Sequence, residues 1–506
     1  MDRSWLEAQI LEIEAQQFAG SPRVDQTGVS FALIEGGKLS LAYARGWANR
    51  ESRVPVTTGT VFPIASITKS FTATALVHAL SQRGLGPETR VKDWVPEFEL
   101  SRSDVSQSAT ASDLLSHACG LPRHDALWFR ARLDGKSLLK RIGSLELFPA
   151  DGSGLRKSFQ YNNLLYGVAG LMTERLTGES WSWLIESRYL APLGMKQTRM
   201  QAPGLDVGDQ ALPCFRENRC SAFPEWSCAP AGSMHSTASD VAKWLELQMD
   251  PKRAAELGLT PAVLEQVWGK SWNRAEGSAD SGSCFETSDY ALGWFNDRFA
   301  GKRWIHHSGS INGFSLFAGF MPDEKLGVVV LVNQVQTKLT KHLASRVLAK
   351  LLGLDAVPPD RYRPPSPYND EGLMPIFPGQ PAFRAQDLAS REALGHAQIR
   401  TLVRHLSHGP DFKHPGYGLL RICESIQNPP KLAPSLPAPD LEVLYEQGPT
   451  WPAWVVAPDQ IIALVDWLGM PARFRFRLNK ERDGSIASVD VPFNINPGVP
   501  ATRFVR

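Results

Sequence analysis

A proline-rich stretch constrains the fold of this chain more than any other feature of its sequence. Prolines recur from Val357 to Pro381, and a proline can neither continue a helix nor donate a hydrogen bond inside a central strand. We therefore expect an extended linker at 356–381, between a larger domain at 1–355 and a smaller one at 382–506. The length of 506 residues exceeds that of one compact core, which agrees with two domains.

The charge balance and the start of the chain narrow the range of partners and locations. Lys and Arg number 54 against 52 for Asp and Glu, so the formal net charge is only +2. We therefore expect no nucleic-acid partner and no membrane partner. No stretch approaches the ~20 apolar residues of a membrane helix. Glu7, Glu12 and Glu14 lie where a signal peptide needs an apolar run, which favours a cytoplasmic protein.

The cysteines indicate neither a disulfide framework nor a metal centre. Six cysteines in 506 residues are too few for a disulfide scaffold. Cys214, Cys220 and Cys228 cluster, but they lack the Cys-x-x-Cys spacing of zinc sites and have no histidine at a matching interval. We expect unpaired thiols, no metal and no cofactor.

Before the linker, strands at both ends of the segment enclose a run of helices. Alternating apolar residues and turn residues predict the strands, and helical periodicity predicts the helices. The expected strands are 29–34, 39–45, 304–307, 314–321 and 326–333, and the expected helices are 68–82, 163–176 and 239–249, the last with Ser239 or Asp240 as its N-cap. A sheet built from both chain ends, with helices between, predicts an α/β (α+β) sandwich.

After the linker the sequence is rich in strand signals. Short apolar segments separated by turns lie at 416–423, 441–446, 461–467, 473–478 and 486–491. This pattern predicts a small antiparallel β-rich domain, either a barrel or a sandwich.

A serine and a lysine three residues apart open the helix expected at 68–82. Ser66 and Lys69 lie in the segment IASITKSF, and their spacing puts both side chains on one face within hydrogen-bond reach. A serine hydroxyl becomes a nucleophile when a base takes its proton, and a lysine can be that base if burial lowers its pKa. Because Ser-x-x-Lys also occurs by chance in many helices, its meaning depends on the rest of the chain.

Two downstream segments complete a recognisable set. Tyr161 and Asn163 form a Tyr-x-Asn block just before a predicted helix, and His307 and Gly309 belong to a His-Ser-Gly block at the end of a predicted strand. The three blocks, in this order, resemble the signature of class C β-lactamases and their penicillin-binding-protein-like relatives.

Other segments extend this resemblance to about residues 20–355. The segments 113–121, 192–195 and 231–240 are similar to further turns of the same family. The resemblance implies a serine β-lactamase-like fold, in which helices flank an antiparallel sheet and an all-α subregion lies beside it. The segment around 414–418 resembles the lipocalin-like C-terminal extension of fungal-type members.

The resemblance implies roles for the matching residues. Ser66 would attack a carbonyl and form an acyl-enzyme, and Lys69 and Tyr161 would share the proton transfers. Which of the two is the base in each step stays open. Asn163 would hold the lysine or the substrate amide. The backbone N–H groups of Ser66 and Ser310 would form the oxyanion hole that stabilises the tetrahedral intermediate.

One position departs from the β-lactamase branch of the family. His307 stands, before Gly309, where β-lactamases and DD-peptidases have a lysine that pairs with the substrate carboxylate. It would line the pocket and bind Tyr161 or the substrate, but without a permanent charge. We therefore rank β-lactamase activity low. Strand alternation turns His306 to the opposite face from His307.

Several other polar residues are more simply explained as structural. His117 and His235 lie in predicted turns, where a histidine usually satisfies backbone hydrogen bonds. Arg123 and Asp125 follow a Gly-Leu-Pro turn and predict an ion pair within a loop.

These features together predict a serine hydrolase that acts on an ester, amide or thioester. The alternative keeps the acyl-enzyme and passes the acyl group to an amine or alcohol, as in an acyltransferase or a cyclase that releases a peptide or polyketide in secondary metabolism. A binding protein on the same fold would be expected to lack Ser66, Lys69 or Tyr161. The substrate would be a small molecule or a peptidyl or acyl group, free or carrier-bound. The sequence does not indicate the oligomeric state.

Overall fold

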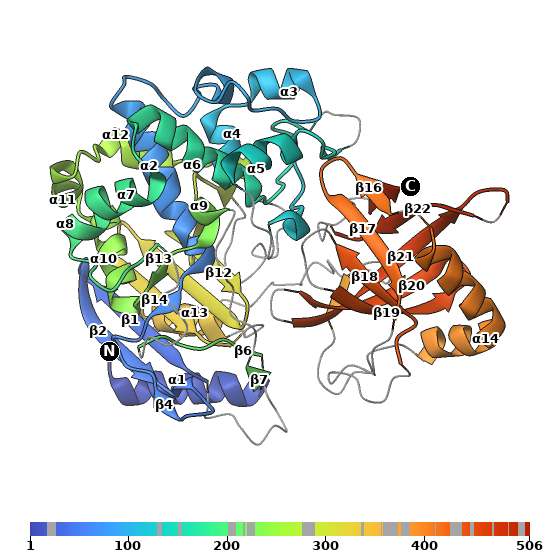
Figure 1. Cartoon of the computed structure of the whole chain (residues 1–506). Coiled ribbons are helices and arrows are strands. Elements are labelled where there is room, and N and C mark those ends of the chain that lie inside the picture. The colour runs from blue at the N-terminus through green and yellow to red at the C-terminus, as the bar shows by residue number, and fades with distance from the viewer. Residues whose placement is uncertain are drawn as a thin grey trace.

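One antiparallel sheet organises residues 1–355, and its strands come from both ends of this segment, as predicted (Figure 1). In spatial order the strands are β2 (Lys38–Arg45), β1 (Val29–Glu35), β14 (Leu326–Val332), β13 (Phe314–Met321), β12 (Lys302–Ile311), β11 (Phe295–Phe299), β10 (Asp289–Tyr290) and β9 (Asn273–Arg274). The two chain ends meet where β1 pairs with β14, with Val29 opposite Val332.

The computed structural model describes most of the chain. The described residues are 1–17, 27–128, 134–149, 154–200, 209–215, 218–219, 228–275, 289–334, 339–355, 357, 373–375, 385–409, 411–425, 438–445, 450–467, 470–483, 485–493 and 501–506.

Helices cover both faces of the sheet, which explains why its central strands are apolar throughout. In β1, Phe31 and Leu33 pack in the cluster that contains α1 (Arg3–Gln17) and α13 (Leu339–Leu351). Ala32 points the other way, into the main core. Alternation along a strand places successive side chains on opposite faces, and both faces here are dry.

The three helices predicted in this part are present. They are α2 (Thr68–Ser81), α6 (Leu164–Thr177) and α10 (Ala238–Met249). The N-cap prediction for α10 was wrong, because Thr237 caps it and its side-chain oxygen accepts from the Asp240 N–H at 3.1 Å. A threonine in extended conformation directly before the first turn satisfies this donor, whereas Ser239 and Asp240 already belong to the helix.

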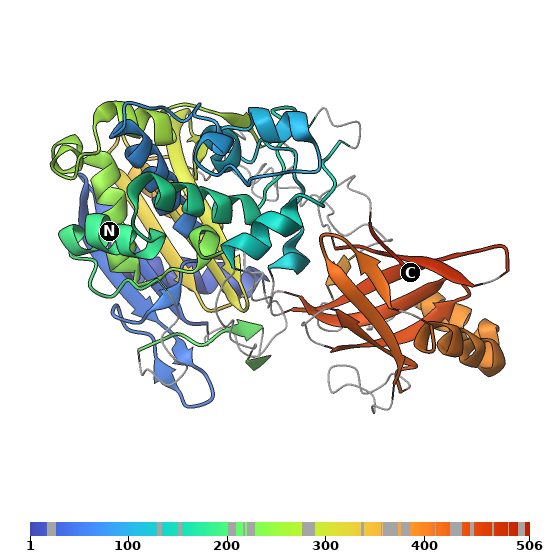
Figure 2. The same ribbon diagram turned by 45° about the horizontal axis from the view of Figure 1, so that its top comes forward.

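Further short helices complete an all-α region, and several of them pack on α2 or α6 (Figure 2). They are α3 (Ser103–Ser108), α4 (Ala111–Leu115), α5 (Gly135–Ile142), α7 (Trp181–Ile185), α8 (Ala191–Leu193), α9 (Ala229–Gly232), α11 (Pro251–Glu256) and α12 (Pro261–Leu264). Short strand pairs complete this part: β3 (Trp47–Asn49) with β4 (Val54–Pro55), β5 (Phe62–Pro63) with β8 (His235–Ser236), and β6 (Cys214–Phe215) with β7 (Asn218–Arg219). Within the described ranges, no helix has the length and apolar content needed to cross a membrane.

The C-terminal part is a closed antiparallel barrel, one of the two predicted arrangements. Its strands run β16 (Phe412–His414), β17 (Gly418–Glu424), β18 (Leu441–Tyr445), β19 (Thr450–Ala457), β20 (Gln460–Trp467), β21 (Met470–Lys480), β22 (Ile486–Val491) and β23 (Thr502–Val505). The barrel closes because β22 pairs with β21 and β23, while β23 also pairs with β16. Closure removes the exposed edges of the sheet.

Three strands and one helix of this part were not predicted. The missed strands are β16, β19 and β23, and the missed helix is α14 (Ala385–Ser407), which packs on β17 and β19. Gly395 breaks the periodicity of α14 with a φ of +69°. Within the proline-rich stretch, β15 (Leu373–Pro375) pairs with β21 as an additional end strand beside the closed barrel, and a proline is tolerated in such a strand. The domain limits themselves stay predictions.

We predict that replacing the buried Phe71 will destabilise the first part of the chain. Its side chain is fully buried on α2 and stacks on Trp244 with ring centroids 4.0 Å apart. Phe71→Ala should lower the free energy of unfolding by about 3–5 kcal/mol, because it leaves a cavity. Urea denaturation would measure this, with Trp183→Ala, at a side chain that is 52% exposed, as the control. Equal losses in both variants would contradict the assigned core.

Candidate active site

Ser66 lies in a strained turn that leads into α2. The turn is η1 (Ala65–Ile67), and Ala65 in it has a φ of +44°, a left-handed conformation that costs a non-glycine residue about 1–2 kcal/mol. The preceding Ile64 N–H donates to the Met234 carbonyl at 2.8 Å. Strain of this kind persists only where the surroundings hold it, and it gathers at functional sites.

The Lys69 amine has three oxygen neighbours, and they come from different parts of the chain. Nζ lies 3.1 Å from Ser66 Oγ, 2.7 Å from Asn163 Oδ1 and 2.8 Å from the Ala231 carbonyl oxygen. The amide oxygen and the carbonyl can only accept hydrogen bonds. A neutral amine would use both of its hydrogens on them and direct its lone pair to the serine hydroxyl.

The surroundings of Lys69 favour this neutral form. Its side chain is fully buried, and burial, with the nearby Arg123 guanidinium, holds its pKa well below the ordinary 10.5. Asp125 and Cys228 act in the opposite direction with smaller effect. Loss of water around the ammonium is the main physical cause.

Tyr161 approaches Ser66 from the other side. Its hydroxyl donates to Ser66 Oγ at 2.8 Å. Lys69 Nζ and the Arg123 guanidinium carbon each lie 4.9 Å from the centroid of its ring, within the range of cation–π contacts. The structure therefore brings the serine, lysine and tyrosine predicted from sequence into one hydrogen-bonded group.

Asp125 orients the amide of Asn163. Asn163 Nδ2 donates to Asp125 Oδ1 at 3.3 Å, so its Oδ1 faces Lys69. Trp128 Nε1 donates to the same carboxylate oxygen at 2.7 Å, and Arg123 Nε donates to the other at 2.6 Å. The predicted loop ion pair is confirmed. Its support of Asn163 was missed, because sequence spacing does not show which helix the loop faces.

His307 and Tyr290 form a second polar pair beside the group. His307 Nδ1 lies 2.6 Å from the Ser308 carbonyl, and its Nε2 lies 2.9 Å from the Tyr290 hydroxyl. The Tyr161 ring is near, with centroids 6.3 Å apart. Tyr290 was not predicted as a site residue. His306 points to the opposite face, as expected, where its Nε2 meets Asp297 at 2.7 Å.

Gly309 lets β12 pass close to the Ser66 turn. A Cβ at Gly309 would lie 2.7 Å from the Ile64 oxygen and 3.3 Å from the Ala65 Cβ, closer than ordinary packing allows. The next residue, Ser310, pairs with Ser315 of β13. The predicted oxyanion donors thus belong to a turn and a strand that lie against each other.

The two histidines expected to be structural are both buried: His117 lies in a turn, whereas His235 belongs to the short strand β8 and not to the predicted turn. His117 Nδ1 accepts from the Asn162 N–H at 3.1 Å, and its ring lies 4.3 Å from that of Tyr161. His235 Nδ1 lies 2.9 Å from the Ser233 carbonyl. Burial lowers the pKa of His117 well below its usual range and that of His235 to about 4, so both are neutral near pH 7.

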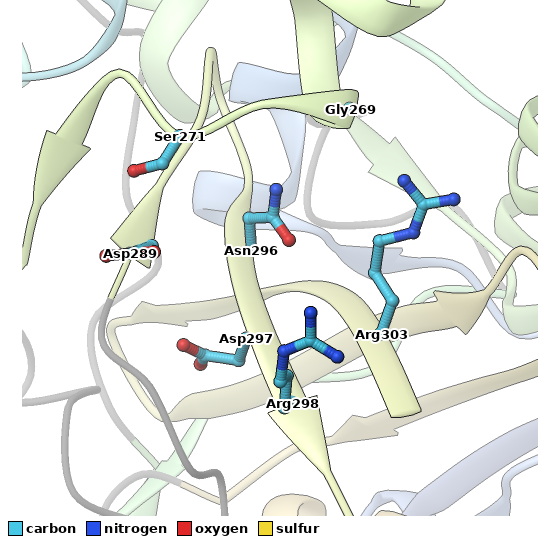
Figure 3. A pocket seen from close by; sticks show the side chains of 7 residues that line it. All are labelled: Gly269, Ser271, Asp289, Asn296, Asp297, Arg298 and Arg303. Carbon is cyan, nitrogen blue, oxygen red and sulfur yellow. The ribbon is translucent and has the colours of Figure 1, made fainter. Parts of the chain in front are cut away.

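A separate polar pocket of about 260 Å³ lies on β10, β11 and β12 (Figure 3). Its lining residues are Gly269, Ser271, Asp289, Asn296, Asp297, Arg298 and Arg303. None of them belongs to the serine group, so the pocket is not the centre described above.

The described residues contain no group of three or more His, Cys, Asp or Glu side chains that could hold a metal ion. Of the cysteines considered above, Cys228 is buried as a free thiol. The side chain of Cys214 and the whole of Cys220 lie outside the described residues.

Comparison with known proteins agrees with the class that this fold and site define, the serine β-lactamase and penicillin-binding-protein group. Residues 18–352 match the family model described as Beta-lactamase. This match covers more than half of the chain, which therefore belongs to the beta-lactamase family.

Two relatives illustrate the level of sequence identity. Protein flp of Staphylococcus aureus (strain MW2) is 25% identical over 333 residues, which cover 63% of each chain. Unguisins hydrolase ungD' of Aspergillus campestris is 28% identical over 356 residues, 66% of this chain and 64% of the relative. The chain thus spans somewhat less than two thirds of the length of these relatives.

The fold of the whole chain also has a solved counterpart. The octameric penicillin-binding protein homologue from Pyrococcus abyssi superposes with a TM-score of 0.59 at 21% identity, and the match covers all of both chains. At this identity, the similarity shows the shared fold.

We predict a pH-dependent stability that depends on Lys69. Because its folded pKa lies below the unfolded value of 10.5, the unfolded chain binds the proton first as the pH falls. The Lys69 contribution to stability therefore decreases below about pH 10.5, by up to ~1.4 kcal/mol per unit until the folded pKa is reached. Unfolding of wild type and Lys69→Met between pH 7 and 9.5 should show wild type gaining relative stability as the pH rises.

The surface residue Lys302 supplies the control for this measurement. Lys302→Met should follow wild type across the same pH range, since its side chain is 43% exposed. A constant difference between wild type and Lys69→Met would contradict a buried amine with a lowered pKa.

Proposed function

We propose that the protein is a serine hydrolase that cleaves an ester, amide or thioester through an acyl-enzyme on Ser66. The observation that carries this proposal is the setting of Lys69, whose two N–H acceptors are the Asn163 amide oxygen and the Ala231 carbonyl. With both of its hydrogens used on these acceptors, a neutral amine would direct its lone pair at the Ser66 hydroxyl, whose Oγ lies 3.1 Å from Nζ. A base held in this way can activate a serine near neutral pH.

The hydrogen-bond directions suggest the order of the proton transfers in acylation. Tyr161 donates to Ser66 Oγ, so with a neutral Lys69 the serine proton would point to Nζ. As Oγ attacks the carbonyl carbon, this proton passes to Lys69. The Tyr161 hydroxyl can then protonate the leaving group and regain a proton from the lysine ammonium.

The backbone around Ser66 is suited to the charge that develops on the carbonyl oxygen. The N–H groups of Ser66 and Ser310 would bind this oxygen, with Gly309 allowing the close approach of β12. Two preorganised donors of this kind are often the largest electrostatic contribution to acyl transfer. In deacylation, water would enter along the path of the leaving group, and Lys69 or Tyr161 would take its proton.

Two observations argue that the proposed hydrolase does not act as a β-lactamase. His307 replaces the permanent cation that binds the substrate carboxylate in β-lactamases, and its nitrogens already meet Tyr290 and the Ser308 carbonyl. One relative is named as a hydrolase of unguisins. The substrate class stays a small molecule or a peptidyl or acyl group, free or carrier-bound, without nucleic-acid or membrane partners.

The second candidate function is acyl transfer or cyclisation from the same acyl-enzyme. It requires the same Ser66, Lys69 and Tyr161, and differs only in the nucleophile that reaches the acyl group. Product analysis with and without an added amine distinguishes the two functions.

We predict that Ser66 becomes acylated by a short p-nitrophenyl ester. Intact-protein mass spectrometry after brief incubation should show one added acyl group in wild type, located in the peptide that contains Ser66. Ser66→Ala should show none and release no p-nitrophenol above background. An adduct on another residue, or an equal adduct in Ser66→Ala, would refute the assigned nucleophile.

We predict that Gly309→Ala will slow acylation without unfolding the protein. The added Cβ would push β12 away from the Ile64 carbonyl and displace an oxyanion donor, so the acylation rate should fall at least ~100-fold. Gly135→Ala is the matched control, since a Cβ there meets no heavy atom within 4 Å. Stopped-flow release of p-nitrophenol measures both rates, and wild-type acylation in Gly309→Ala would contradict the arrangement.

A further inference from the structure

A loop of the C-terminal barrel packs against the catalytic part of the chain (Figure 1, Figure 2). The loop joins β16 to β17 and ends at Gly418. A Cβ on Gly416 would lie 2.5 Å from Leu145 Cδ2 and 3.2 Å from the Arg141 oxygen, so the backbone makes close contact there. Arg141 Nη1 donates to the Tyr417 carbonyl at 3.2 Å.

Tyr417 makes the central contact of this loop. Its side chain is fully buried, its ring stacks on Phe493 with centroids 4.9 Å apart, and its hydroxyl lies 2.7 Å from His124 Nδ1. His414 Nδ1 accepts from the backbone N–H of Tyr417 at 3.1 Å and fixes the turn. The hydroxyl is thus held in place from the barrel side.

His124 occupies a backbone conformation that needs such support. Its φ is +46°, which is unfavourable for a residue other than glycine. It directly precedes Asp125, whose carboxylate accepts from Asn163, and Asn163 in turn accepts from Lys69. A change in the turn at His124 would therefore move the carboxylate that orients the lysine partner.

We propose that Tyr417 is a positioning residue, through which the C-terminal barrel holds the His124–Asp125 turn and thereby places Asn163 against Lys69. In this proposal the barrel helps to set the geometry of the active site. This inference rests on the proposed function for its kinetic consequences, while its structural consequence is independent of any activity.

The structure offers a matched control for this inference. Tyr189 and His78 form a second buried pair, with the hydroxyl 2.9 Å from Nδ1, and burial lowers the pKa of His78 to about 4, close to the value of about 3 for His124. Within the part of the chain that the structure describes, neither Tyr189 nor His78 hydrogen-bonds to the Asp125 carboxylate. Loss of either tyrosine hydroxyl removes a buried hydrogen bond to a histidine.

The experiment compares Tyr417→Phe with Tyr189→Phe in the full-length chain. Both should lose thermal stability to a similar extent. Only Tyr417→Phe should lower kcat for a p-nitrophenyl ester about tenfold and move the acid limb of its pH profile upward by about half a unit, because Lys69 becomes better solvated. Hydrogen-exchange mass spectrometry should show faster exchange at 122–128 and 160–165 in Tyr417→Phe alone.

The outcomes separate this inference from the proposed function. Absence of ester turnover in wild type would count against the proposed function, and the exchange data would still decide the positioning role. The inference would be overturned if Tyr417→Phe kept the kcat, the pH profile and the hydrogen exchange of wild type. It would also be overturned if Tyr189→Phe changed these quantities as much as Tyr417→Phe.

A second pair of variants covers the case in which Tyr417→Phe does not fold. His124→Asn and His124→Gly both tolerate a positive φ, but only asparagine keeps a polar group near the position of Nδ1. Asn should retain most of the wild-type kcat and Gly should show the tenfold loss. Equal activity in the two variants would contradict the positioning role.

Discussion

The site depends on one desolvated amine that is held between acceptors. Lys69 lies in the interior with the Asn163 amide and the Ala231 carbonyl as neighbours, and the cost of burying an ammonium there lowers its pKa. Two neighbouring features support this arrangement: the strained turn at Ala65 places Ser66 beside the amine, and Asp125 orients the Asn163 amide. Removal of any of these groups would leave the Lys69 amine either wrongly oriented or protonated.

The fold supplies these neighbours from distant parts of the chain. The turn η1 carries Ser66 and helix α2 carries Lys69. The residue before α6 is Asn163, α9 brings Ala231, and β12 brings Gly309 beside Ser66. The sheet provides a fixed frame for them because its central strands are buried on both faces. The barrel contributes through Tyr417, which ties the second part of the chain to this centre.

The parts of the fold and of the site that depend on residues close together in the sequence could be predicted. Helix α2 and strands β13 and β14 follow from periodicity, and the Ser66–Lys69 spacing follows from helix geometry. The structure confirms the antiparallel sheet and shows that the C-terminal part is a barrel. Helix α14 was missed because Gly395 interrupts its apolar stripe. The Asp125–Asn163 and Tyr417–His124 contacts were missed because they join segments that only the tertiary fold brings together.

The most direct test of this account is the titration of Lys69 in the resting protein. The chain labelled with ¹³C at lysine Cε would be followed by NMR across pH, with Lys69→Met identifying the signal. We predict a midpoint well below the ordinary 10.5 of a lysine, because the buried ammonium loses its hydration. A signal that titrates near 10.5 would mean that Lys69 is an ammonium at neutral pH and does not act as the base for Ser66.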